Sequence, residues 1–244
     1  ALDLGAKNQQ DFLRKIGMFT PVSLEIPEQG RPILPRQWSE LTTMTVAYGH
    51  GLSVSALQLV RGIATITGDG RLHPLTLIKN GNAGKKAGEQ VLRPRTVEDV
   101  RELMRLVVKH GSGKSANAGG YFVIGKTGTA EKLVNGRYTK GGNNVTIFTG
   151  AFPAYAPKYA FVVMVDEPKG NKATYGFSTA GWTAAPAVGR VVQRMAPLLG
   201  VAPDFNRGEP MVDALWTDAQ RRSKTAKQNR LEKLQKEAIR NASY

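Results

Sequence analysis

The apolar residues of this sequence recur with two different spacings, which predict both helices and strands. A recurrence every three or four residues predicts helices at residues 8–16, 53–67, 96–109 and 183–199. Runs of β-branched and aromatic residues predict strands at about 121–133, 144–152 and 159–166, with a further extended stretch at 71–78. The turn between the last two strands is short, which indicates an antiparallel meander. The pattern therefore predicts an α+β fold in which helices cover an antiparallel sheet.

Residues 204–244 differ from the rest of the chain in composition. They are polar and basic, with only a thin helical stripe of leucine and alanine. Between Arg221 and Arg240 there are eight Lys or Arg and two Glu, a net charge of +6. A segment with so few apolar residues buries little surface. We therefore predict one domain at residues 1–203 and a basic, partly helical or disordered tail at residues 204–244.

The whole chain is strongly basic, with a net charge of +15 and a pI of about 10.1. Such a charge is typical of nucleic-acid binders. However, no aromatic residues interleave with the basic run, so bases have no stacking platform there. We expect no nucleic-acid partner, because a basic surface equally suits anionic envelope polymers or a lipid surface.

The absence of cysteine excludes a Cys nucleophile, disulfides and thiolate metal sites. The three histidines, His50, His73 and His110, are widely spaced and lack the spacing of metal ligands. We therefore expect neither a metal nor another cofactor. No apolar run reaches the ~18 residues that a membrane helix needs.

The most informative stretch is Lys126-Thr127-Gly128-Thr129-Ala130, which follows the apolar run at 121–124. Thr127 and Thr129 are two residues apart, so in a strand their hydroxyls point to one face. Gly128 has no Cβ, so another backbone could approach closely there. Lys126 adds a positive charge. These residues suit an extended peptide with a terminal carboxylate, laid along the edge of the strand.

A nucleotide-binding alternative rests on two patterns. Gly120, Gly125, Lys126 and Thr127 match the P-loop spacing, and residues 161–167 mimic the strand and Asp that help to hold Mg²⁺. A P-loop needs a strand before its first glycine and a helix after its Thr. This sequence has a polar, glycine-rich stretch before Gly120 and poor helix formers after Thr127, which disfavours an ATPase.

Two shorter matches carry less weight. The stretch from Gly176 to Ala180 nearly makes a nucleophile elbow around Ser178 but lacks its last glycine. Ser115-Ala116-Asn117 has a Ser-x-Asn form, but it lies only a few residues before Lys126, within a glycine-rich stretch. We interpret Ser115 and Asn117 as loop residues.

The Lys126-Thr127-Gly128 triplet resembles the third motif of penicillin-binding proteins and serine β-lactamases. Four further segments resemble parts of class B penicillin-binding proteins in the same order: Gly5–Gly17, Tyr48–Leu59, Thr149–Pro168 and Ala184–Val188. The resemblance covers about residues 1–200 and is strongest to the division-specific (septal) peptidoglycan transpeptidases. It implies the fold of the serine β-lactamase and penicillin-binding superfamily.

The resemblance also implies roles for individual residues. Thr127 and Thr129 are expected to bind the terminal carboxylate of the substrate, with Gly128 between them, and the Thr129 N–H to donate to the oxyanion. Lys126 is expected to link to the serine of the Ser-x-Asn motif. Tyr138 and Tyr175 either form an aromatic wall of the site or are ordinary packing tyrosines.

The family attacks with the Ser of Ser-x-x-Lys, and no Ser-x-x-Lys occurs in these 244 residues. Residues 1–5 also look like sequence from within a domain. We therefore expect the C-terminal part of a transpeptidase domain, inactive alone and exposing apolar surface where the rest would pack.

The resemblance implies peptidoglycan stem peptides and β-lactams as ligands. The expected partners are membrane proteins of the division machinery, met through the full-length protein at the periplasmic face of the bacterial inner membrane. Three alternatives remain besides the ATPase: a β-lactam-hydrolysing enzyme, a β-lactam sensor domain and a non-catalytic binding module.

Overall fold

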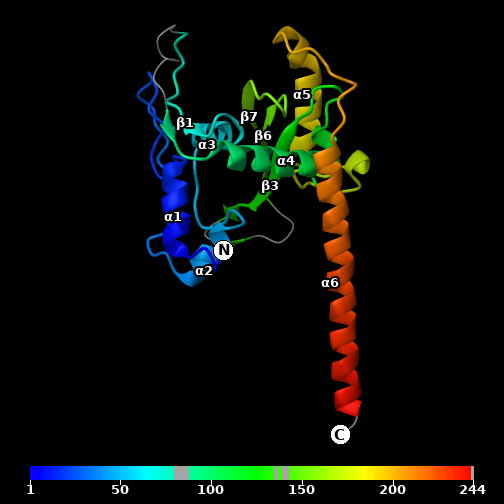
Figure 1. Ribbon diagram of the computed structural model, residues 1–244. Helices are drawn as coiled ribbons and strands as arrows, with labels where there is room; N and C mark the ends of the chain where they lie inside the picture. Colours follow the sequence, from blue (N-terminus) through cyan, green and yellow to red (C-terminus); the bar gives the residue numbers. More distant parts are fainter. Residues whose placement is uncertain (80–87, 135–136, 139–142, 243–244) are drawn as a thin grey trace. The chain divides into compact units, whose positions relative to one another are not determined.

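The computed structural model of the protein describes residues 1–79, 88–134, 137–138 and 143–242 (Figure 1). Its α-helices are α1 (Ala6–Lys15), α2 (Glu40–Val46), α3 (Ala56–Thr67), α4 (Pro94–His110), α5 (Ala184–Leu198) and α6 (Pro210–Ala242). Its strands are β1 (Arg71–Leu72), β2 (Glu89–Gln90), β3 (Ile124–Glu131), β4 (Leu133–Val134), β5 (Arg137–Tyr138), β6 (Asn144–Phe152) and β7 (Tyr159–Asp166). Two short 3₁₀ helices are η2 (Lys114–Ala116) and η3 (Lys172–Thr174).

The chain forms two units, Ala1–Phe205 and Asn206–Tyr244. The second unit contains helix α6, whose side chains from 217 to 230 are all exposed. The assignment of residues 204–244 as a tail stays a prediction. Within the described residues, we find no helix with the length and apolar character that a membrane crossing requires.

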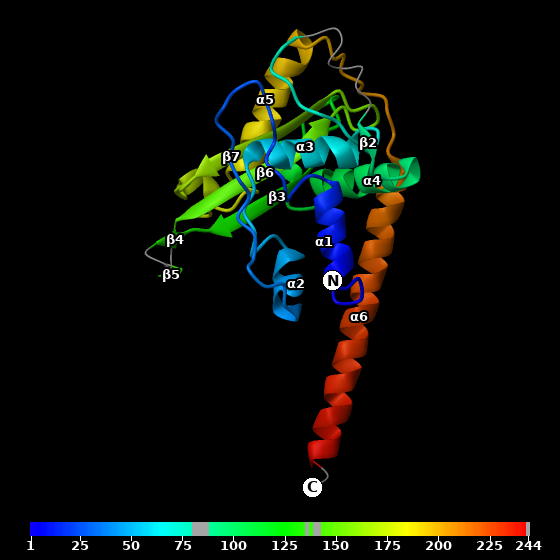
Figure 2. The ribbon, with the colours of Figure 1, turned by 90° about the vertical axis from the view of Figure 1, so that its left-hand side faces the viewer.

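The first unit is built on a three-stranded antiparallel sheet in the order β3-β6-β7, which confirms the predicted meander. Alternate residues of β6 point to opposite faces. Phe148 and Phe152 join a core that includes α5, whereas Ala151 joins a core that includes α3 and α4. The sheet therefore lies between α5 on one face and α3 and α4 on the other (Figure 2), as an α+β fold with helical cover requires.

Phe148 is the largest fully buried side chain of the core that includes α5. Its ring stacks on Phe161, with ring centroids 6.2 Å apart, and it also occupies the space beside Gly125. A Cβ atom on Gly125 would lie 2.3 Å from the Phe148 ring. Gly125 is therefore required by the packing of the sheet.

Helix α3 begins with a capping box. The Ser55 hydroxyl accepts from the Gln58 N–H, and the Gln58 side chain accepts from the Ser55 N–H. Of the two predicted caps, Ser53 and Ser55, the structure uses Ser55. Gln58 is fully buried and also donates to the carbonyls of Met18 and Thr20, so the cap anchors the preceding segment to the helix.

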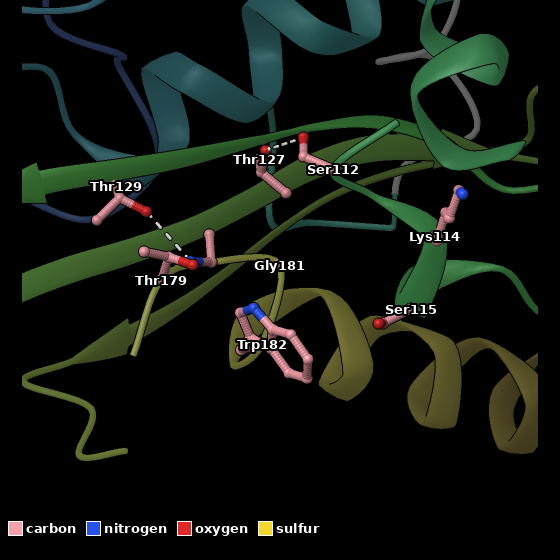
Figure 3. Close-up of a pocket in the computed structure, with 9 residues that line it drawn as sticks. Ser112, Lys114, Ser115, Thr127, Thr129, Thr179, Gly181 and Trp182 are labelled. Carbon is pink, nitrogen blue, oxygen red and sulfur yellow. Dashed lines mark hydrogen bonds between the residues drawn. The ribbon is translucent and has the colours of Figure 1, made fainter. Parts of the chain in front are cut away.

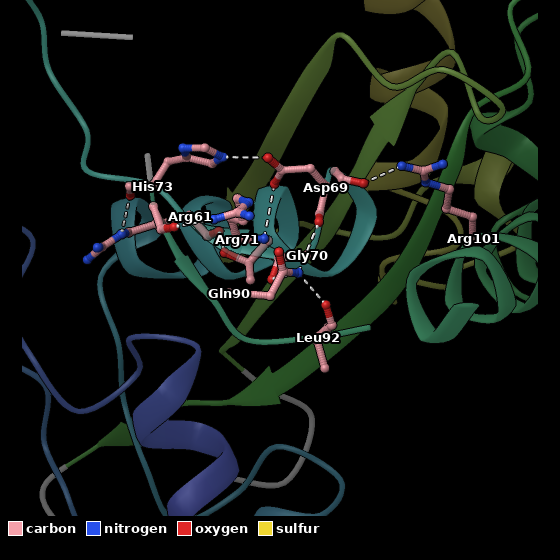
Figure 4. A network of polar contacts seen from close by, with 11 residues as sticks. Arg61, Asp69, Gly70, Arg71, His73, Gln90, Leu92 and Arg101 are labelled. Carbon is pink, nitrogen blue, oxygen red and sulfur yellow. Dashed lines mark hydrogen bonds and ion pairs between the residues drawn. The ribbon is translucent and has the colours of Figure 1, made fainter. Parts of the chain in front are cut away.

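A network of polar contacts links the end of α3 to its surroundings (Figure 4). Arg101 of α4 donates to the carbonyls of Thr67 and Gly68, the last acceptors of the helix. The Asp69 carboxylate and the His73 ring are 2.8 Å apart. Partial burial raises the pKa of Asp69, but hydrogen bonds from His73 and the backbone outweigh it, so that pKa lies below its ordinary value.

One predicted strand is shorter in the structure, and the predicted extended stretch at 71–78 forms a strand only in part. Strand β3 begins at Ile124 and not at residue 121, because Tyr121 and Val123 turn into the core and Phe122 has a φ of 46°. Only residues 71–72 of the predicted stretch 71–78 form a strand. The Thr76 hydroxyl and the Leu77 N–H instead donate to the Glu25 carboxylate.

Candidate active site

On the edge of β3 that faces away from β6, every second residue exposes its backbone N–H and carbonyl groups. In the described part of the chain, β3 pairs only with β6. Just beyond the strand, the Lys132 N–H donates to Asn143 at 2.8 Å on the β6 side, whereas the Thr127 carbonyl accepts from the Lys126 ammonium at 2.9 Å. Since successive residues direct their backbone groups to alternate edges, the N–H groups of Thr127 and Thr129 face the unpaired edge.

The side chains of Thr127 and Thr129 line one cavity of about 370 Å³ (Figure 3). The cavity also involves the segment before β3 and the segment before α5. Its lining residues are Ser112, Lys114, Ser115, Thr127, Thr129, Thr179, Ala180, Gly181 and Trp182. Lys126 is not among them, because its side chain leaves the strand on the other face.

Each threonine hydroxyl is held by a group from a different segment. The Thr127 and Ser112 hydroxyl oxygens are 2.7 Å apart. The Ala180 N–H donates to the Thr129 hydroxyl at 3.1 Å. Because the Thr129 oxygen accepts this bond, its own proton remains available to a ligand. The arrangement therefore presents oriented hydroxyl donors beside the outward N–H groups of the edge.

Gly128 lies in open space. A Cβ atom built on it has no described atom within 4 Å, and its φ is not in the left-handed region. Neither packing nor backbone conformation therefore requires glycine at this position, unlike at Gly125. The side of the strand at Gly128 has room for a second backbone, as the sequence suggested.

Aromatic residues gather beside the cavity. Trp182 stacks on Phe177 with ring centroids 5.6 Å apart and meets Tyr175 edge-on at 5.8 Å. Tyr175 is 79% exposed, so it is not an ordinary core residue. The predicted partner Tyr138 lies in β5, and its side chain is outside the described residues.

Three groups at the site were missed by sequence reasoning: the hydroxyl of Ser112, the N–H of Ala180 and the ring of Trp182. Ala180 is 51 residues from Thr129, so no local pattern connects them. Ser115, interpreted as a loop residue, lies in η2 and lines the cavity. Asn117 has a structural contact, because its side-chain oxygen accepts from Arg105 at 3.0 Å.

The nucleotide-binding alternative is wrong. Lys126 and Thr127 lie inside β3, which continues to Glu131, so no helix N-terminus follows them to receive a phosphate. Asp166, the proposed Mg²⁺ ligand of that alternative, is paired with Lys132 at 2.9 Å. The hydrogen bonds that Lys132 donates, first to Asp166 and then to Glu167, raise the pKa of Lys132.

The family profile described as "Penicillin binding protein transpeptidase domain" matches residues 1–188. The "Probable peptidoglycan D,D-transpeptidase FtsI" of Caulobacter vibrioides is 36% identical over 207 residues, which are 81% of this chain and 35% of that protein. The "Probable peptidoglycan D,D-transpeptidase PenA" of Neisseria flavescens is 36% identical over 200 residues, which are 81% of this chain and 48% of that protein.

Solved structures of penicillin-binding proteins are also similar to this chain. The apo transpeptidase domain of Burkholderia pseudomallei penicillin-binding protein 3 superposes with a TM-score of 0.72 at 30% identity, covering 83% of this chain and 60% of that one. Mycobacterial penicillin-binding protein 3, solved in complex with ampicillin, gives a TM-score of 0.73 at 26% identity, covering 86% of this chain and 49% of that one.

The sheet, its helical cover and the Lys-Thr-Gly edge strand define a domain of the penicillin-binding type. The chain belongs to the family of penicillin-binding protein transpeptidase domains. It spans between a third and a half of the length of these two curated relatives.

Proposed function

We propose that this chain forms the carboxylate-binding side of the active site of a peptidoglycan D,D-transpeptidase. One observation carries the proposal: the unpaired edge of β3 presents the Thr129 N–H together with the hydroxyls of Thr127 and Thr129. An extended peptide gains backbone hydrogen bonds by lying along such an edge. Its terminal carboxylate then meets the hydroxyl-lined cavity.

The proposed reaction is acyl transfer through a serine ester. A serine oxygen attacks the carbonyl carbon of the penultimate D-Ala, and the carbonyl oxygen becomes an oxyanion. The C–N bond then breaks, and the terminal D-Ala leaves with a proton on its amine. An amine of a second stem peptide attacks the ester, forms the cross-link and releases the serine. The Thr129 N–H supports the oxyanion in both steps, a contribution of roughly 3 kcal/mol.

The remaining residues have proposed roles around this edge. Gly128 leaves room for the peptide backbone. Lys126, whose ammonium lies 3.4 Å from the Thr127 hydroxyl, is assigned the link to the serine of the Ser-x-Asn motif. Tyr175, together with Trp182, forms an aromatic side of the cleft, and Tyr138 is proposed to extend it.

Penicillin labelling tests the proposal. The 244 residues contain no Ser-x-x-Lys, so we expect no covalent label on this chain alone, whereas the intact protein isolated from cells is expected to take one equivalent of a fluorescent penicillin. Denaturing gels and intact mass measure both. A stoichiometric label on the 244-residue chain, or none on the intact protein, contradicts the proposal. Slow loss of the label distinguishes a transpeptidase from a β-lactam-hydrolysing enzyme.

We also propose a septal role at the periplasmic face of the inner membrane, in contact with membrane proteins of the division machinery. The resemblance of the sequence to division-specific transpeptidases supports this role, and the Caulobacter relative, named a probable peptidoglycan D,D-transpeptidase, is consistent with it. A fluorescent fusion of the intact protein is expected to concentrate at midcell before constriction. A fusion distributed evenly along the cell wall, with division proceeding normally after depletion of the protein, argues for a role in elongation.

A further inference from the structure

The cavity beside β3 has a second wall that the family motif does not include. The segment between α4 and β3 contributes Ser112, Lys114 and Ser115 (Figure 3). Across the whole lining there are five hydroxyl side chains, one ammonium group and no carboxylate. A cavity of this composition suits an anion, because hydroxyls donate to it and the ammonium balances its charge.

The second wall is held by two close approaches, one to the segment before α5 and one to α5 itself. A Cβ atom on Gly181 would lie 2.8 Å from the Ser112 carbonyl oxygen, and one on Gly189 would lie 2.8 Å from the Ser115 carbonyl oxygen. Such contacts are possible only with glycine at both positions. The Ser112 hydroxyl is also bonded to Thr127. The backbone that carries Lys114 is therefore fixed beside the cavity.

Lys114 is available to a ligand. Its side chain is exposed and makes no hydrogen bond or ion pair within the described residues. Lys126, the lysine of the motif, is not part of the cavity lining, and its ammonium already donates to the Thr127 carbonyl and lies 3.4 Å from the Thr127 hydroxyl. A carboxylate held by the two threonines would thus have Lys114 in the cavity lining in addition to Lys126, which comes from the strand itself.

We propose that Lys114 is a substrate-binding residue that supplies the cavity-side positive charge for the terminal carboxylate of the substrate. The proposal rests on the proposed transpeptidase function and deepens it. Lys114 belongs to the α4–β3 segment and not to the strand, so it acts on binding of the carboxylate and not on the chemistry at the serine.

Benzylpenicillin and its methyl ester form a matched pair of probes, because the ester lacks the negative charge. In the intact protein, Lys114→Met is expected to raise the pre-covalent dissociation constant of benzylpenicillin about fivefold, the effect of an exposed, partly screened charge. The rate constant of acylation itself and the reaction with the ester should stay unchanged. Stopped-flow acylation over a range of ligand concentrations separates the two constants.

Two variants serve as controls. Lys114→Arg keeps the charge and should restore binding. Lys158→Met removes an exposed lysine from the β6–β7 turn, away from the cavity lining, and should leave both probes unaffected. If Lys114→Met behaves like Lys158→Met while the wild type is acylated normally, Lys114 has no such role. If the wild type is not acylated at all, the proposed function fails together with this inference.

Discussion

Gly125→Ala is expected to destabilise the fold by about 1–3 kcal/mol, the usual cost of overpacking a core. The added methyl would lie 2.3 Å from the Phe148 ring and 2.6 Å from the Thr149 carbonyl oxygen. Phe148 is fully buried, and the carbonyl belongs to the adjacent strand, so neither can move without disturbing the sheet. Thermal unfolding followed by circular dichroism measures the loss.

Gly128→Ala is the matched variant three residues along the same strand. Its methyl would meet no described atom within 4 Å, so the expected change in unfolding free energy is within ~0.5 kcal/mol. Acylation of the intact protein by penicillin should nevertheless fall about 10- to 100-fold, because the methyl fills open space in which we propose that the ligand backbone lies. Equal loss of stability in both variants would mean that Gly128 is a structural glycine. Unchanged acylation in Gly128→Ala would mean that no ligand lies close to it.

Local sequence patterns were sufficient to predict several of the helices and strands that position the site. In β6 and β7 the run of apolar residues is bounded by turns, and in α3 an apolar surface follows a capping serine. Each of these features depends on neighbours within about four residues in the sequence. The predicted strands at 144–152 and 159–166 accordingly match the observed ones.

The beginning of β3 could not be predicted in the same way. Tyr121, Val123 and Ile124 are all buried, but only Ile124 lies in the strand. Apolar residues are required both in a strand and in a segment that turns into the core, so periodicity alone does not distinguish the two. In the structure, the carbonyls before β3 have partners distant in sequence: Arg105 of α4 donates to the Val123 carbonyl at 2.9 Å, and the Ala154 N–H donates to the Phe122 carbonyl at 2.8 Å.

The Lys-Thr-Gly-Thr motif could be recognised from the sequence, but the groups that orient its threonine hydroxyls could not. The spacing of Thr127 and Thr129 predicts that they share a face, and both line the cavity. Their partners Ser112 and Ala180 come from segments that only the tertiary fold brings to the strand. Neither partner has a local signal, since a serine in a glycine-rich segment and a backbone N–H occur throughout any sequence.

Thr129→Val is expected to lower penicillin acylation of the intact protein more than Thr129→Ser does. Serine keeps the hydroxyl, which accepts from the Ala180 N–H and can still donate to a carboxylate. Valine keeps the shape of threonine but places a methyl group against the anion. Loss of a hydrogen bond to a charged group costs about 1.5–3 kcal/mol, or roughly ten- to a hundredfold in rate if the bond is made in the transition state.

A structural effect of Thr129→Val must be separated from this loss, because valine also removes the acceptor of the Ala180 N–H. The unfolding temperature of each variant shows how much of the change comes from the fold. Thr127→Val removes the hydroxyl of the other threonine of β3 and its contact with Ser112, so it should lower acylation to a similar extent. The Thr129 N–H survives all three substitutions, so none of them should abolish acylation.

Lys126→Ala should reduce acylation more than any threonine substitution. It removes a charge that lies 3.4 Å from the Thr127 hydroxyl and also the proposed link to the serine motif, so both binding and the chemical step are affected. Second-order acylation rates for the four variants give the order. If Thr129→Val and Thr129→Ser react alike, the Thr129 hydroxyl is not a ligand of the carboxylate, and this residue serves the reaction through its backbone alone.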